Sequence, residues 1–180
     1  MIPAGYLYKL VSPQTEWLKR SGISDIFSLS NCISKDFLDY VQFWQHNGYW
    51  LFNTPEDMKA LALQQGTDLC QATLFYYEAY EREYDKDTGS WSPSLPEPTF
   101  LTEVRPPEKK SLQGFDVVCC ERDTSPGCSP LSCNGIANEI AVNGHCLFDS
   151  LDQAKRALET GKFEKSEPGP YRIFAVYTVP

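Results

Sequence analysis

The sequence lacks the features that would place the chain in a membrane or direct it out of the cell. It has no apolar run approaching the roughly 20 residues that a membrane-spanning helix needs. The first residues, Met1–Gly5, contain neither the basic patch nor the apolar stretch of a signal peptide. Hydrophobic residues make up 42% of the 180-residue chain, which is enough for a folded core. We therefore expect a soluble, cytoplasmic, globular protein.

Positive charge is also scarce. The chain has 16 Lys and Arg against 24 Asp and Glu, which gives a formal net charge of −8. The densest basic cluster is Lys109-Lys110, which is flanked by Glu108. Since nucleic-acid binding depends on clustered cations, we expect no nucleic-acid partner and no anionic membrane surface. An acidic surface suits a basic protein partner, although the same charge also serves solubility alone.

Short catalytic motifs are missing as well. The sequence contains no P-loop, no glycine-rich dinucleotide turn, no HExxH, no GxSxG and no protein-kinase motif set. It has two histidines, which limits acid–base chemistry by imidazole. The sequence therefore indicates no cofactor, and a protein without enzymatic activity is favoured over an enzyme.

Cysteine, in contrast, is abundant. The seven cysteines are an odd number, and in a cytoplasmic chain they are expected as reduced thiols. A zinc site would need four converging ligands, and because neighbours on a strand point to opposite faces, it would take one residue from each adjacent pair. The candidate ligands are Cys119, Cys128, Cys133 and His145. Buried thiols without a metal are the favoured alternative.

Three side chains are candidates for catalysis. Cys146 and Cys133 are potential nucleophiles, but a catalytic thiol needs an imidazole within hydrogen-bonding distance. His145 cannot serve Cys146 if the two are adjacent on a strand. Glu78 follows aromatic residues and precedes two further glutamates, a composition that could bind a sugar or nucleotide. The interpretation we favour is that these glutamates lie at the solvated end of a strand.

One local pattern occurs twice. The segment at 47–54 (NGYWLFNT) recurs 96 residues later at 143–150 (NGHCLFDS) with four identical positions. Each copy predicts a tight turn, an apolar strand and a helix that begins after Thr54 or Ser150. Further strands are predicted at 5–11, 72–80, 115–119 and 171–179. We interpret this order as a tandem duplication, with chance similarity as the alternative.

The predicted organisation is two α+β units, at 1–82 and 114–180, joined by a proline-rich linker at 83–113. We expect them to form one pseudo-symmetric globule with a mixed or mainly antiparallel sheet and one main helix per unit. The linker is either a plain connector or a strap that lies across one face of the core.

The favoured function is an acidic, non-enzymatic protein-binding module, such as an inhibitor or immunity-type protein, that acts on a basic partner as a monomer or homodimer. Surplus aromatic residues are expected mainly in the core, with some at a protein interface. The candidate interface residues are Trp44, Tyr49, Trp50 and Trp91. The alternative function is an enzyme that acts on a small substrate in the cleft between the units, using carboxylates or a cysteine.

Overall fold

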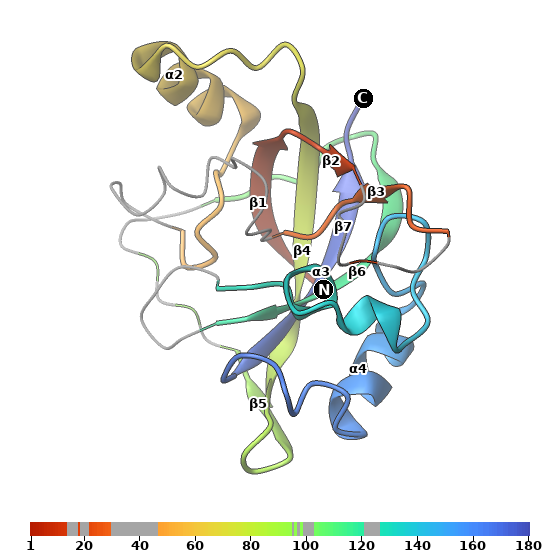
Figure 1. Cartoon of the computed structure of the whole chain (residues 1–180). Coiled ribbons are helices and arrows are strands. Elements are labelled where there is room, and N and C mark those ends of the chain that lie inside the picture. Colours follow the sequence, from red (N-terminus) through yellow and green to blue (C-terminus); the bar gives the residue numbers. More distant parts are fainter. Residues whose placement is uncertain are drawn as a thin grey trace.

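The computed structural model describes residues 1–13, 18, 22–29, 47–94, 96, 98, 103–120 and 127–180. Its centre is an antiparallel sheet in the order β1-β4-β7-β6, with β5 paired to β4 as a hairpin (Figure 1). The strands of this sheet are β1 (Ile2–Lys9), β4 (Thr73–Asp85), β5 (Ser90–Pro93), β6 (Ser111–Cys119) and β7 (Tyr171–Thr178). The short strands β2 (Ser12–Pro13) and β3 (Asp25–Ile26) form a separate pair. The expected α+β class with an antiparallel sheet is confirmed.

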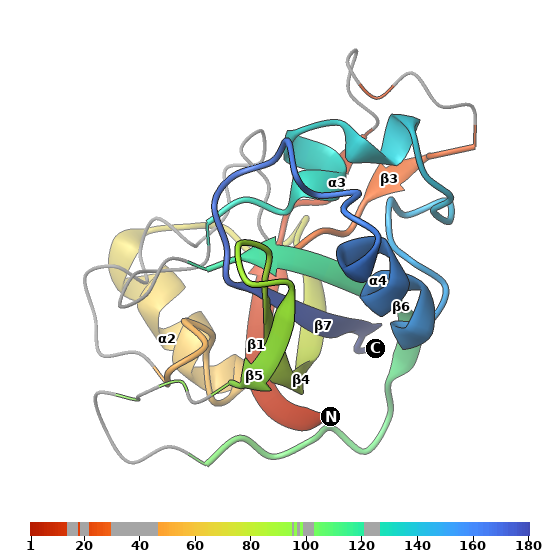
Figure 2. The same ribbon diagram turned by 90° about the horizontal axis from the view of Figure 1, so that it is seen from below.

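Two helices lie at opposite edges of the sheet. α2 (Pro55–Gln65) contacts β1, and α4 (Leu151–Glu159) contacts β6 and β7 (Figure 2). A short helix α3 (Pro130–Cys133) and a 3-10 turn η1 (Ile136–Asn138) contact each other, and α3 packs against β6. In the described part of the chain, no helix is long and apolar enough to cross a membrane.

Both helices begin where their caps predict. The Thr54 hydroxyl accepts a hydrogen bond from the Asp57 backbone N–H, and the Asp57 carboxylate accepts one from the Thr54 N–H, each at 3.2 Å. The Ser150 hydroxyl accepts from the Gln153 N–H at 3.3 Å. These bonds satisfy N–H groups that the first helical turn leaves without partners, so the two helix starts follow from local sequence.

The predicted apolar strands at 49–52 and 145–148 are wrong. Each run forms a loop that touches the sheet through a single bridge, at Phe52 with Tyr6 and at Phe148 with Phe115. Trp50 and Cys146 occupy the same place in the two loops, and each has a backbone φ of 60°. A left-handed residue in the middle of a run breaks the alternation that a strand requires.

The side chain of Asn47 holds the first of these loops. Its Nδ2 donates to the Ala4 carbonyl of β1 at 2.8 Å. Its Oδ1 accepts from the backbone N–H groups of Tyr49 and Leu51, at 3.1 and 3.2 Å. The amide thus replaces the ladder bonds that a strand would have made.

Asn143 holds the second loop in the same way. Its Nδ2 donates to the Gln113 carbonyl of β6 at 2.8 Å, and its Oδ1 accepts from the N–H groups of His145 and Leu147 at 2.9 and 3.2 Å. The repeated Asn-Gly dipeptide is therefore a loop anchor rather than a hairpin turn.

The strand registers of the two halves correspond. Gly5 of β1 pairs with Tyr77 of β4, and Gly114 of β6 pairs with Val176 of β7, with a β-bulge before each glycine. Tyr77 and Val176 also pair with each other where β4 meets β7. The register is therefore the same on either side of the Tyr77–Val176 pair.

The two halves share their cores. One buried cluster combines Leu7, Phe52 and Phe75 of the first half with Phe174 and Val176 of the second. The other lies around α4 and includes Ile23, Ile26 and Tyr84 from outside the second half. The segment at 24–27 crosses to the second half through hydrogen bonds to the carbonyls of Gly144 and His145.

The predicted linker at 83–113 is only partly a linker. Its start belongs to β4, which runs to Asp85, its middle contains β5, and its end is the beginning of β6. The described remainder from Glu103 to Lys110 has no helix or strand and leads into β6 (Figure 2). The strong turn and proline signals hid the end of β4 and the start of β6, because neither Glu83-Tyr84-Asp85 nor Ser111-Leu112-Gln113 has an apolar run that marks a strand.

Candidate functional site

A cluster of ionisable side chains lies where the two central strands meet. Tyr76 and Glu78 of β4 pair with Tyr177 and Ala175 of β7, so the tyrosines and the glutamate share one face of the sheet. Tyr177 Oη donates to Glu78 Oε2 at 2.9 Å, and Tyr76 Oη donates to Oε1 at 3.4 Å. Lys110, just before β6, donates from Nζ to Oε1 at 2.5 Å.

The Lys110 ammonium also lies against aromatic rings. Its Nζ is 4.8 Å from the centroid of the Tyr76 ring and 4.3 Å from that of Tyr177. The two ring centroids are 5.8 Å apart, and the Tyr6 ring extends the row at 5.0 Å from Tyr76. A cation within about 6 Å of a ring face is attracted by the ring quadrupole, so carboxylate and rings act on the same ammonium.

The electrostatic surroundings fix the protonation of this cluster. Burial alone would raise the pKa of Glu78, but hydrogen bonds from Lys110 and the tyrosines and the Lys110 charge outweigh it and lower that pKa. Burial, together with the Glu78 charge, raises the pKa of Tyr177 to about 12 and raises the pKa of Tyr76 as well. At neutral pH the cluster is therefore an ionised carboxylate with two phenol donors and an ammonium.

The three glutamates of β4 have different surroundings. The side chains of Glu78 and Lys110 are 15% and 26% exposed, and Glu83 pairs with Arg172 at 3.0 Å. Only Glu81 is exposed. The favoured interpretation of a solvated strand end is therefore wrong for Glu78 and Glu83, because β7 brings partners to them that lie far away in the sequence.

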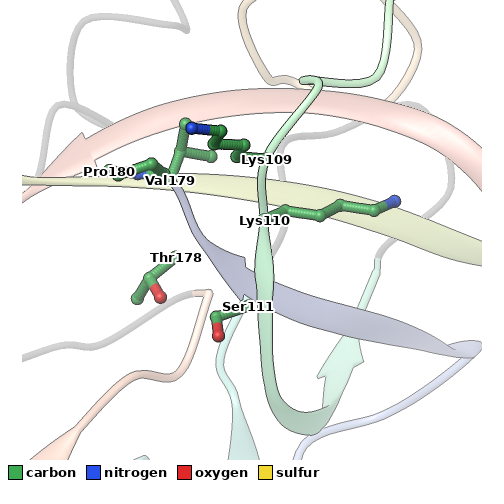
Figure 3. A pocket seen from close by; sticks show the side chains of 6 residues that line it. All are labelled: Lys109, Lys110, Ser111, Thr178, Val179 and Pro180. Carbon is green, nitrogen blue, oxygen red and sulfur yellow. The ribbon is translucent and has the colours of Figure 1, made fainter.

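A shallow cleft lies at the end of β7 and the start of β6 and touches the cluster only at Lys110. Its volume is about 360 Å³, and it is lined by Lys109, Lys110, Ser111, Thr178, Val179 and Pro180 (Figure 3). In Figure 3 the Lys110 side chain extends away from the other labelled side chains. The segment that carries these lysines is tied to the sheet by Tyr6, whose hydroxyl donates to the Arg105 carbonyl at 2.5 Å.

Of the two candidate cysteine nucleophiles, Cys146 lacks an activating environment. Cys146 is fully buried, and burial raises its pKa to about 12. Cys133 is half-buried at the end of α3. His145 stacks on Phe27 with ring centroids 4.1 Å apart, and its Nδ1 is 3.7 Å from an Asp25 oxygen. Since a catalytic thiol needs a lowered pKa, Cys146 in this setting stays protonated.

The four candidate zinc ligands do not gather. Cys119 is buried, and its Sγ accepts a hydrogen bond from the Cys128 backbone N–H at 3.0 Å. Among the residues that the structure describes, no three His, Cys, Asp or Glu side chains are grouped as metal ligands would be. Cys119 and Cys120 belong to different core clusters, as expected for neighbours that point to opposite faces.

The candidate interface aromatics are dispersed. Trp44 lies outside the described residues. Tyr49 is 8% exposed and packs edge-on against Phe174, while Trp50 is half-buried against the same core. Trp91 is half-buried on β5 and donates from Nε1 to a carboxylate oxygen of Glu159 on α4 at 2.8 Å. The described members of this set thus have packing roles within the fold and form no single patch.

Sequence analysis missed a second polar cluster, which surrounds Asp116 in β6. The Ser129 hydroxyl and the Leu29 backbone N–H donate to its Oδ2 at 2.6 and 2.7 Å. The buried Lys9 donates to the carbonyls of Ser28 and Leu29. Burial raises the pKa of Asp116 to about 6, although these hydrogen bonds and the Lys9 charge act in the opposite direction. The detectable signal was a single carboxylate in an otherwise apolar strand.

One oxygen of this buried carboxylate is unpaired. Within the described ranges, Asp116 Oδ1 accepts no hydrogen bond, and the residue is fully buried. A buried charge with an unsatisfied oxygen costs stability, and such groups concentrate at functional sites. Asp116 is therefore a second candidate site among the described residues.

No family model, no curated protein and no solved structure matches the chain. The function is therefore inferred from the molecule's own geometry.

Proposed function

We propose that this protein is an acidic, non-enzymatic binding module that docks a basic protein partner through the exposed face of α2. The observation that carries this proposal is Leu63, which is 82% exposed in the last turn of α2, the longest helix among the described residues. Ala60, one turn before it, is exposed as well. Isolated exposed leucines are common, so the argument also requires the surroundings of this one.

The charges around α2 favour a basic partner. The first turn of α2 carries Glu56 and Asp57, its last turn has no basic residue, and Asp68 follows. Lys59 is the single cation of the helix and pairs with Glu56 at 3.9 Å. An apolar contact with an acidic rim is suited to a partner that presents an apolar socket with a basic rim, because complementary potentials speed encounter and exclude wrong partners.

The test is affinity capture from a lysate of the source organism, with wild type compared with Leu63→Gln. We expect wild type to retain a basic protein that Leu63→Gln loses, while the unfolding free energy of the variant changes by less than about 0.5 kcal/mol. Binding of the purified pair should then weaken as salt rises.

The matched control is Leu112→Gln, which removes another exposed leucine, 50% exposed on β6. This variant should retain the partner as wild type does. Capture that is equal for all three proteins, or a retained partner whose binding ignores salt, would overturn the proposal.

We also propose that the two halves descend from a tandem duplication. The support is the matching set of Asn47 and Asn143 hydrogen bonds, the paired left-handed residues, and the equal strand registers.

A cytoplasmic location is proposed on the six described cysteines, all of which are free thiols. We also propose that the protein is a monomer or a homodimer.

A second candidate function is an enzyme with its site between the two halves. The observation that favours it is Asp116, whose pKa of about 6 is near that of a general acid or base, with the Ser129 hydroxyl 2.6 Å away. A substrate would have to reach a carboxylate that is fully buried. This requirement makes the binding module the better-supported proposal.

A further inference from the structure

The cluster around Glu78 has the composition of a receptor for an ammonium group. It combines one ionised carboxylate with the rings of Tyr76 and Tyr177, and it already holds the Lys110 ammonium at 2.5 Å from Glu78 Oε1. We propose that this cluster, the ammonium cage, is a binding site for an external alkylammonium group, and that Lys110 occupies it as an intramolecular ligand. The external group would be a lysine side chain of a protein or a free quaternary ammonium compound.

The chemistry of the cage discriminates between ligands. A carboxylate and two ring faces attract any cation, but ring faces favour a poorly hydrated, alkylated ammonium over a small metal ion. Both phenols keep their protons because of their raised pKa values, and both donate to Glu78. Their hydrogen bonds hold the carboxylate in place whether or not an ammonium is present.

The position of Lys110 allows exchange. The residue lies outside the strand ladder, since β6 begins at Ser111, and its side chain is 26% exposed. The side chain of Glu78 is 15% exposed as well, so an incoming ammonium reaches the carboxylate directly from solvent. Exchange would therefore need rotation of one side chain, with the sheet unchanged.

The cage is independent of the α2 surface on which the proposed function rests. A lysine of the basic partner is one source of the ammonium, but a free quaternary ammonium compound needs no partner protein. Loss of partner binding in Leu63→Gln would not affect the cage, and failure of the cage would leave the α2 proposal standing.

The experiment is an NMR titration of protein with 13C-labelled tyrosine rings. The probes are tetramethylammonium chloride and, separately, N-acetyl-lysine methylamide, added to wild type, Lys110→Ala, the double variant Lys110→Ala/Glu78→Gln, and Lys109→Ala. An intramolecular ligand competes at an effective concentration of millimolar or more, so Lys110→Ala should bind at least one probe about tenfold more tightly than wild type.

The expected signature is a shift of the Tyr76 and Tyr177 ring signals together, with the signal of the buried Tyr171 unchanged as a report on the fold. The double variant should lose the tighter probe binding of Lys110→Ala. Lys109→Ala should bind both probes as wild type does. Binding of the lysine derivative would identify a protein side chain as the ligand class, and binding of tetramethylammonium alone would identify a free quaternary ammonium.

The proposal is overturned if Lys110→Ala shows no paired shift of Tyr76 and Tyr177 with either probe, or if the double variant Lys110→Ala/Glu78→Gln shows the same shift as Lys110→Ala. If Lys110→Ala alters the Tyr171 signal, the wild-type titration decides. Tetramethylammonium in excess must then displace Lys110 and shift the same two rings, and no shift would refute the cage.

Discussion

The two halves of the molecule share a backbone frame and differ in what they place on it. The Asn47 and Asn143 loops have the same hydrogen bonds, and Gly5 and Gly114 have the same position on their strands. At equivalent places, however, Leu7 of β1 pairs with Phe75 while Asp116 of β6 pairs with Phe174. The comparison teaches that backbone geometry is constrained in both halves, whereas the buried carboxylate of Asp116 has no ionisable counterpart at Leu7.

The glycines allow the strongest test of the shared frame. A Cβ at Gly5 would lie 2.6 Å from Leu51 Cβ and 2.7 Å from the Phe52 carbonyl oxygen, and one at Gly114 would lie 2.7 Å from the Phe148 oxygen. Both have φ values near +140°, 139° and 146°. We expect Gly5→Ala and Gly114→Ala each to lower the unfolding free energy by about 3–5 kcal/mol, because strain and overlap add.

Urea unfolding of both variants measures these losses. The control is Gly22→Ala, where φ is also positive but nothing lies within 4 Å of the added Cβ. That variant should lose about 1–2 kcal/mol, from backbone conformation alone. A large loss in only one of the two halves would show that their frames are not energetically equivalent.

The two asparagines come next in expected effect. Replacing Asn47 or Asn143 with alanine leaves two backbone N–H groups and one carbonyl without their partners. We expect a loss of about 2–4 kcal/mol for each, measured by urea unfolding. Asn134→Ala is the control, since its side chain reaches Glu167 at an exposed position. Equal stability of all three variants would contradict the anchoring role.

Asp116 tests the difference between the two halves, because, among the described residues, it places a buried carboxylate in only one of them. Burial raises the pKa of the Asp116 carboxyl to about 6 in the folded protein, whereas the ordinary pKa of an aspartate is 3.8. The stability contributed by the protonated carboxyl is therefore full below about pH 4 and is lost as the pH rises from 4 to 6. Asp116→Asn should remove this dependence and stabilise the protein at pH 7 by roughly 2–3 kcal/mol.

Thermal or urea unfolding of wild type and Asp116→Asn at several pH values between 4 and 7 gives this difference directly. Asp87→Asn, at an exposed turn between β4 and β5, is the control and should leave the pH profile unchanged. If Asp116→Asn is less stable than wild type at pH 7, the buried carboxylate stabilises the fold, and this would contradict the expected free-energy cost of burying it.

Part of this fold was predictable because its signals are local. Thr54 and Ser150 cap helices that begin one residue later, since a cap acts on N–H groups within three residues. The strands around Tyr6, Val117 and Ile173 were recognisable from branched and aromatic residues. The runs at 49–52 and 145–148 were mistaken for strands because composition does not reveal a left-handed backbone.

The candidate sites were harder to predict. Glu78 was identified as a candidate, but its surroundings were expected to be solvent. The metal-ligand set was suggested by cysteine spacing, and the described residues do not bring its members together. Asp116 was missed because the sequence does not show whether a single aspartate in an apolar strand is buried or exposed.

The sequence by itself determined the helix starts and most of the long strand segments, because the signals for both lie within a few neighbouring residues. Only the tertiary structure decided which ionisable side chains meet. The pairing of β4 with β7 brings Tyr177 to Glu78 across 99 positions, and the start of β6 brings Lys110 to it across 32. Burial then sets which of these groups are ionised, and burial is a property of the packed sheet and of no single segment.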